Sequence, residues 1–260
     1  IVPERYFPAG TSTMPPPFSL QVLMALLIAT VLDVLPLPFA PKSFTFNVTN
    51  SFSITGLNTW NVSKVTSMRG MFADCSAFAV YCDKWNVSNV TDMRRTFAGM
   101  KNLKELNLSG WQVQKVTTMK EMFAYSPLTA LNLDGWQTLS LTDTASMLAG
   151  CSLACPPVHH FDMSKVTVCA QMFSHNDALK QIRLYNWNTA FVKDISGMFS
   201  FCKNLHTVDL RRFDISSVTN ISSMFLQCSS LKRVYTGRWR FRSPILMSTT
   251  FFGCTVLENT

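Results

Sequence analysis

One stretch of sequence decides the fold: Trp60-Asn61-Val62-Ser63-Lys64-Val65-Thr66-Ser67-Met68-Arg69-Gly70-Met71-Phe72. Its opening aromatic residue recurs every 25 or 26 residues, at Trp60, Trp85, Trp111, Trp136, Phe161, Trp187, Phe213 and Trp239. A repeat of this length indicates stacked units that share one continuous core. Such a chain places its function on an extended surface, whereas an enzyme needs groups that converge in a pocket.

The first half of each unit predicts a short helix. Val65, Met68, Met71 and Phe72 are three, three and one residues apart, so their side chains fall on one stripe of a helix. Thr66 precedes this stripe and is predicted to cap the helix through its hydroxyl. The equivalent threonines are Thr91, Thr117, Thr142, Thr167 and Thr219.

The second half of each unit changes to Leu-x-x-Leu-x-Leu, which predicts a short strand with one buried face. Leu103, Leu106 and Leu108 form one such run, and related runs occupy 128–133, 179–184, 205–210 and 231–236. One strand and one helix per unit predict a right-handed α/β solenoid, because parallel crossovers take that hand. In the fourth unit Pro156 and Pro157 fall where the strand belongs, so an irregular strand is expected there.

These motifs resemble a known repeat family. The run 60–75 and its counterpart 213–231, with Met224-Phe225 and Cys228, look like the BspA-type leucine-rich repeat of mycoplasma lipoproteins and protist surface proteins. The resemblance covers about 44–260. It implies a leucine-rich-repeat solenoid that is exported, displayed at a cell surface and used for adhesion or ligand binding, and it carries no catalytic residues.

Four regions are expected along the chain. Residues 1–17 form a disordered or non-native leader, and 18–41 form a hydrophobic signal peptide or anchor with a Pro-rich tail, with a buried helix as the alternative. Residues 42–59 form an N-terminal cap with strand character. Residues 60–260 form about seven and a half repeats, of which the last is truncated.

The positive charge of the chain is concentrated near one end. The formal net charge is +8 at pH 7, and eleven Lys and Arg stand against three Asp within 180–242. Strand alternation predicts that several of these cations point outward beside tyrosines, and the candidate ligand-binding residues are Arg183, Tyr185, Arg211, Arg233 and Tyr235. Such a strip suits an acidic protein or an anionic glycan; a merely solvated face is the alternative, and nucleic acid is disfavoured.

Asn-x-Ser/Thr sequons are candidate glycosylation sites if the chain enters a eukaryotic secretory path. They occur at Asn47, Asn61, Asn86, Asn89, Asn107 and Asn220.

The sequence predicts neither a metal site nor a cofactor site. The cluster Cys151, Cys155, His159 and His160 has no standard zinc spacing. Cysteines that share one repeat position, such as Cys202 and Cys228, could form a ladder of buried thiols or, in an oxidising compartment, disulfides between neighbouring units.

No catalytic motif is apparent, so a non-enzymatic, extracellular or surface-displayed binding protein is expected. Its ligand would be a protein or an anionic glycan held on the strand-lined face. The N-terminal apolar segment could anchor the chain to a membrane, and the oligomeric state stays open. An intracellular interaction scaffold and a structural coat or wall component are the alternatives.

Overall fold

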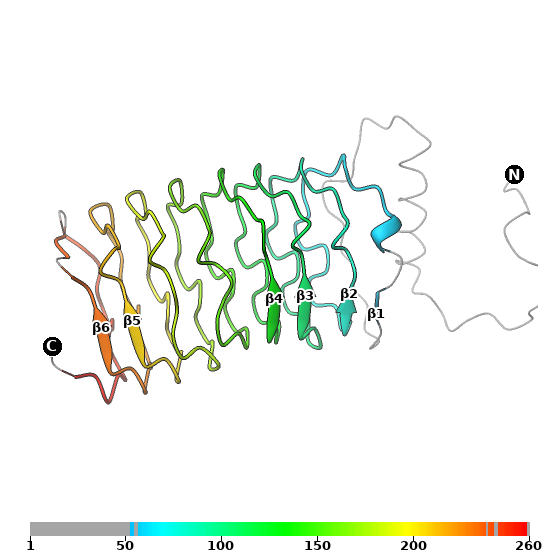
Figure 1. Cartoon of the computed structure of the whole chain (residues 1–260). Coiled ribbons are helices and arrows are strands. Elements are labelled where there is room, and N and C mark those ends of the chain that lie inside the picture. Colours follow the sequence, from blue (N-terminus) through cyan, green and yellow to red (C-terminus); the bar gives the residue numbers. More distant parts are fainter. Residues whose placement is uncertain (1–52, 55–56, 238, 242–243, 259–260) are drawn as a thin grey trace, which may run out of the picture.

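The computed structural model describes residues 53–54, 57–237, 239–241 and 244–258. Its regular elements are β1 (Ser53–Ile54), the 3-10 helix η1 (Leu57–Thr59), β2 (Ala79–Val80), β3 (Glu105–Asn107), β4 (Ala130–Asn132), β5 (Thr207–Asp209) and β6 (Arg233–Tyr235). Figure 1 shows the chain winding through successive similar turns, here called coils, that lie side by side in sequence order. Each coil corresponds to one sequence repeat, so equivalent residues become neighbours.

Parallel pairing connects neighbouring coils. The strands form three two-stranded sheets, β1 with β2, β3 with β4, and β5 with β6. A second set of contacts also connects every coil to the next. It consists of single-residue parallel β-bridges at the seventh residue after each opening aromatic residue. These bridges join Ser67, Asp92, Thr118, Asp143, Val168, Asp194, Asn220 and Leu246 in that order.

The prediction of an α/β leucine-rich-repeat solenoid with one short strand and one short helix per unit is wrong. The described residues contain no α-helix, and the segment expected to be helical is a series of turns. The tenth and fourteenth residues after each opening aromatic residue have positive φ, which a right-handed helix does not accommodate. These residues are Gly70, Asp74, Arg95, Gly99, Glu121, Tyr125, Ser146, Gly150, Gln171, His175, Gly197, Phe201, Ser223, Gln227, Thr249 and Gly253.

The hydrogen bonds of these turns explain why a helix does not form. Met71 N–H donates to the Met68 carbonyl at 3.1 Å, which closes a turn within the coil. The amide on either side donates to the next coil instead: Gly70 to the Arg94 carbonyl and Phe72 to the Thr96 carbonyl, each at 2.8 Å. Successive backbone amides therefore alternate between a hydrogen bond within the coil and a hydrogen bond to the next coil. This pattern satisfies the backbone N–H groups without any i→i−4 bonds.

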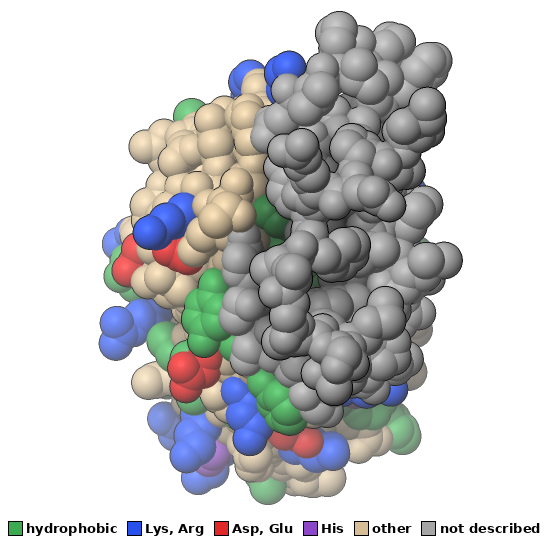
Figure 2. Space-filling view, turned by 90° about the vertical axis from the view of Figure 1, so that its right-hand side faces the viewer, with side chains coloured by type: hydrophobic (Ala, Val, Ile, Leu, Met, Phe, Trp, Pro, Cys, Tyr) green, Lys and Arg blue, Asp and Glu red, His purple; other side chains and the backbone are tan. Residues whose placement is uncertain are grey.

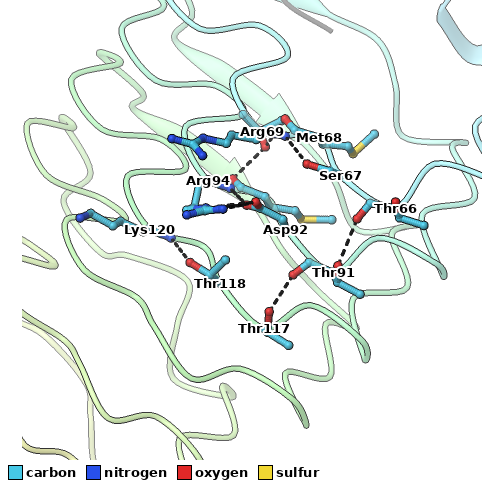
Figure 3. A network of polar contacts seen from close by, with 12 residues as sticks. Thr66, Ser67, Met68, Arg69, Thr91, Asp92, Arg94, Thr117, Thr118 and Lys120 are labelled. Atoms are coloured by element: carbon cyan, nitrogen blue, oxygen red, sulfur yellow. Dashed lines mark hydrogen bonds and ion pairs between the residues drawn. The ribbon is translucent and has the colours of Figure 1, made fainter. Parts of the chain in front are cut away.

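The threonines predicted as helix caps have another role. Thr91 Oγ1 donates to the Thr66 carbonyl at 3.2 Å, and Thr117 Oγ1 donates to the Thr91 carbonyl at 3.0 Å (Figure 3). Thr142, Thr167 and Thr219 bond to the preceding coil in the same way. These hydroxyls link coils to one another and cap no helix.

The recurring aromatic residues build the core, as the sequence predicts. Trp85 and Trp111 are buried, and their rings stack with centroids 6.3 Å apart. A second column runs through the Met-Phe positions, where the Phe97 and Phe123 centroids are 5.8 Å apart. At roughly 1.5–3 kcal/mol for each fully buried large side chain, these columns supply much of the stability of the stack.

The indoles from the second repeat onward also donate to a carbonyl of the preceding coil; these are Trp85, Trp111, Trp136, Trp187 and Trp239. Trp111 Nε1 donates to the Cys82 carbonyl at 2.9 Å, and Trp136 Nε1 donates to the Leu108 carbonyl at 2.8 Å. Where the repeat has phenylalanine, this donor is missing. At Phe161 the neighbouring His160 contacts the corresponding Leu133 carbonyl through Nε2 at 3.1 Å, so the imidazole takes the place of the indole N–H.

The strand predictions are confirmed at β3, β4, β5 and β6, but the strand predicted at 179–184 is wrong. No strand is assigned among the described residues between β4 and β5. Pro156 and Pro157 lie in this interval and cannot donate to a ladder, which leaves the run 179–184 without a regular partner on that side.

Candidate functional site

The predicted ligand-binding residues lie on the outer side of the pair β5–β6. In this pair Thr207 is opposite Arg233 and Asp209 is opposite Tyr235, while Val208 points inward. Arg233 and Tyr235 are exposed on the same side of β6. The strand alternation therefore exposes the side chains of Arg233 and Tyr235 to solvent, as the sequence predicts.

Arg211 lies immediately after β5 and binds a carboxylate on that strand. Its Nη2 is 2.6 Å from Asp209 Oδ2, and its guanidinium carbon is 5.5 Å from the centre of the Tyr235 ring. The side-chain hydrogen bonds from Arg211 lower the pKa of Asp209. Arg211, Asp209 and Tyr235 thus form one exposed cluster across two coils.

Arg233 is also paired, with a residue of the last coil. Its Nε donates to Glu258 Oε2 at 2.6 Å. Two of the three predicted arginines therefore have an acidic partner, and a strip of three unpaired cations is not what the structure shows. Both pairs are exposed, and exposed pairs contribute only about 0–1 kcal/mol.

Arg183 and Tyr185 are exposed and lie one coil before β5, in a run without assigned strand structure. Among the described residues, no carboxylate forms an ion pair with Arg183. Counting along the repeat, Arg183 occupies the position of Asp209, and Tyr185 that of Arg211. The three arginines are therefore staggered across the face and do not share one column.

Sequence reasoning missed a column of basic side chains at the start of these strands. Backbone bonds connect His206 N to the Lys180 carbonyl at 3.2 Å and Lys232 N to the His206 carbonyl at 2.9 Å. All three side chains are exposed. Their spacing of 26 residues equals the repeat, which is the signal that could have identified them.

Basic side chains also occur on other surfaces. Figure 2 shows the end of the stack that carries β1, where Lys and Arg are interspersed with fewer Asp and Glu around the residues that are not described. In the same half of the molecule Arg94 Nη2 is 2.6 Å from Asp92 Oδ2 (Figure 3). Burial alone would raise the pKa of Asp92, but the hydrogen bonds from Arg94 lower it.

The candidate glycosylation sites are mostly accessible. Asn61, Asn86, Asn89 and Asn107 are exposed and Asn220 is half-buried, while Asn47 lies outside the described residues. The first two share one local geometry, in which the Asn Oδ1 accepts from the backbone N–H and the hydroxyl of the serine two residues on.

The eight cysteines are free thiols, and seven of them are buried or half-buried. Cys202 Sγ donates to the Phe173 carbonyl at 3.0 Å, and Cys228 and Cys254 make the same contact one and two coils further on. Burial raises the pKa of the Cys151, Cys169 and Cys202 thiols to about 12. These protonated thiols are poor nucleophiles and poor metal ligands.

The histidine pair at 159–160 packs against neighbouring groups of the chain. Burial lowers the pKa of His160, with the neighbouring His159 as a further cause, and its ring contacts a backbone carbonyl as described above. Among the described residues, no group of three His, Cys, Asp or Glu is placed to hold a metal ion.

Membrane anchoring was expected from residues 18–41, which lie outside the described residues. Within the part of the chain that is described, no helix has the length and apolarity needed to cross a membrane.

The fold and its surface define a repeat protein built from stacked parallel coils with exposed, charged strand edges. Residues 42–156 and 142–260 each match the family described as "Mycoplasma protein of unknown function, DUF285", and the chain belongs to this family. A search of curated proteins found no match.

Proposed function

We propose that this chain is a non-enzymatic binding protein that recognises an anionic macromolecule, with an anionic glycan as the favoured class. The site comprises the outer face of β5–β6 and the preceding coil, with Arg183, Arg211 and Arg233 as its cations. The observation that carries the proposal is the parallel register of β5 and β6, which brings Arg211 over Tyr235 and sets Arg233 on the same exposed face.

The ion pairs on this face are compatible with ligand binding. The side chains of Arg211 and Asp209 are 63% and 49% exposed, and those of Arg233 and Glu258 are 50% and 45% exposed. Because exposed pairs are weak, sulfate or carboxylate groups of a polyanion can replace Asp209 and Glu258 at small cost. When one polymer makes several such contacts, the first contact raises the effective concentration for the others, so the overall affinity exceeds that of a single contact.

The test measures binding of the full chain to heparin, used as a sulfated polysaccharide probe, at low and physiological salt. The triple variant Arg183→Ser, Arg211→Ser and Arg233→Ser is expected to bind at least tenfold more weakly, which corresponds to about 1.4 kcal/mol. Binding by the parent chain is expected to fall as salt rises, since exposed charges are screened.

A matched control removes the same charge from the other half of the molecule. Lys101, Lys104 and Lys115 are exposed, and their simultaneous replacement by serine should change binding much less. If both triple variants lose binding equally, the probe senses only net charge. If neither loses binding, the strand face is not the site.

Display at the cell surface is part of the same proposal. Its support is the resemblance to BspA-type surface proteins together with membership of a mycoplasma family. Labelling of intact cells with a membrane-impermeant reagent, followed by recovery of the chain, tests it, and protection until the cells are lysed would contradict it.

A further inference from the structure

A second surface of the stack carries exposed or half-buried rings that contribute to neither the core nor the strand face: Tyr125 and His175 are exposed, and Phe201 is half-buried. Tyr125, His175 and Phe201 occupy the fourteenth position of the third, fifth and sixth repeats, and Gly150 occupies it in the fourth. All four have positive φ. We call these four residues the aromatic edge.

The rings of the aromatic edge form a continuous row. The Tyr125 ring is 62% exposed, and its centroid is 6.3 Å from that of His175, two coils away. His175 in turn stacks on Phe201, with centroids 4.5 Å apart and an angle of 20° between the ring planes. These two distances place the first and last ring centres no more than about 11 Å apart, which matches roughly three sugar rings.

Gly150 allows the row to form. A Cβ at this position would lie 2.5 Å from Tyr125 Cδ1, so any larger residue would displace the tyrosine ring. The glycine therefore lets Tyr125 lean across its coil and approach His175.

Few ionic groups surround the row, and those that flank it pair with one another: Lys203 with Asp177 at 3.4 Å and Arg95 with Glu121 at 3.0 Å. The turns 145–151, 170–176 and 196–202 contain no Lys, Arg, Asp or Glu. They offer hydroxyl and amide groups instead, such as those of Ser146 and Gln171, where Ser146 Oγ donates to Gln171 Oε1 at 3.4 Å. A partner that recognises this edge must stack on aromatic rings and exchange neutral hydrogen bonds.

We infer that the aromatic edge binds a neutral saccharide chain. A sugar ring presents an apolar C–H face that packs on an aromatic ring, while its hydroxyls bond to neighbouring polar groups at the rim. The charges that flank this edge are of both signs and pair with one another, so they offer no excess charge to a charged polymer. This site is separate from the anion-binding face proposed above, and it takes a different class of ligand.

The experiment uses the full chain with three neutral soluble probes, laminarin, mannan and dextran, in affinity electrophoresis followed by titration calorimetry. At least one probe is expected to bind, with an affinity that salt does not change. Tyr125→Ala and Phe201→Ala should each weaken that binding about tenfold, as expected when a central aromatic contact is removed.

Tyr81→Ala is the matched control, because this tyrosine is 54% exposed but lies elsewhere on the surface. Failure of all three probes to bind would overturn the inference. So would equal effects of the control and edge variants, or an edge variant that alters only self-association in light scattering. Heparin binding by the strand face is measured separately, so either proposal can fail alone.

Discussion

Glycine substitutions at Ser146 and Ala145 distinguish the observed turn from the helix that the sequence pattern predicts. Ser146 occupies the tenth position of the fourth coil and has a φ of 53°, whereas its neighbour Ala145 is not among the residues with positive φ. In a helix, glycine would destabilise either position by roughly 0.5–1 kcal/mol. In the observed turn the two positions should respond with opposite sign.

The magnitude follows from two opposing terms. A residue with a Cβ at positive φ costs about 1–2 kcal/mol, which glycine avoids. Glycine lowers the free energy of unfolding by about 0.5–1 kcal/mol, because it has greater conformational freedom in the unfolded chain. Ser146→Gly should therefore be about 0.5–1 kcal/mol more stable than Ser146→Ala, and this comparison removes the hydroxyl from both variants. Ala145→Gly should be less stable than the parent by about 0.5–1 kcal/mol.

Thermal unfolding of the full chain, followed by tryptophan fluorescence, measures these differences. For a chain of this size 1 kcal/mol shifts the midpoint by about 2–4 °C. Ser146→Gly should therefore melt above Ser146→Ala, while Ala145→Gly melts below the parent. A lower midpoint for Ser146→Gly than for Ser146→Ala would refute the turn assignment.

Three further predictions concern buried polar groups and thiols. In the native chain a maleimide should modify exposed Cys155 first and should label buried Cys202 only after unfolding. Mass spectrometry of samples taken at successive times measures the order of labelling. Rapid labelling of Cys202 in the native chain would contradict its burial. Burial raises the pKa of the Cys202 thiol in the folded chain to about 12, from an ordinary value of about 8.5. The stability that the protonated thiol contributes is therefore complete below about pH 8.5 and is lost as the pH rises toward 12. Cys202→Ser should show a smaller loss of melting temperature between pH 8 and pH 11 than the parent, and identical slopes would be inconsistent with this linkage. Asn176 is buried; its Oδ1 has no hydrogen-bond partner among the described residues, whereas its Nδ2 donates to the Leu148 carbonyl at 2.7 Å and to the Phe173 carbonyl at 2.9 Å. Asn176→Cys, which introduces the residue found at the equivalent position 202, removes the unpaired oxygen and should raise stability by about 1 kcal/mol in denaturant unfolding. A loss would show that the hydrogen bonds from Nδ2 outweigh the unpaired oxygen.

Part of the candidate site could be predicted from the sequence. Alternation in 231–236 was sufficient to place Arg233 and Tyr235 on the outer face, because a strand of period two leaves no other choice once Val234 faces inward. The pairing of Arg233 with Glu258 could not be predicted in this way, since it joins residues 25 positions apart in coils whose relative register only the stack defines. The row from Tyr125 to Phe201 was missed for the same reason, because its rings meet across coils and each appears isolated in the sequence.

The sequence by itself determined the repeat, the buried aromatic and Met-Phe columns, the positions of β3, β4, β5 and β6, and the interruption at Pro156, although the strand that it predicts at 179–184 is not formed. These features depend on side-chain polarity and size at fixed intervals, which are properties of the chain alone. Only the tertiary structure decided the conformation of the first half of each unit. Apolar residues three and four apart suit a helix, but they equally suit successive turns whose alternate amides bond to the next coil. That neighbouring coil supplies acceptors such as the Arg94 carbonyl for Gly70, and an isolated repeat has no such partner.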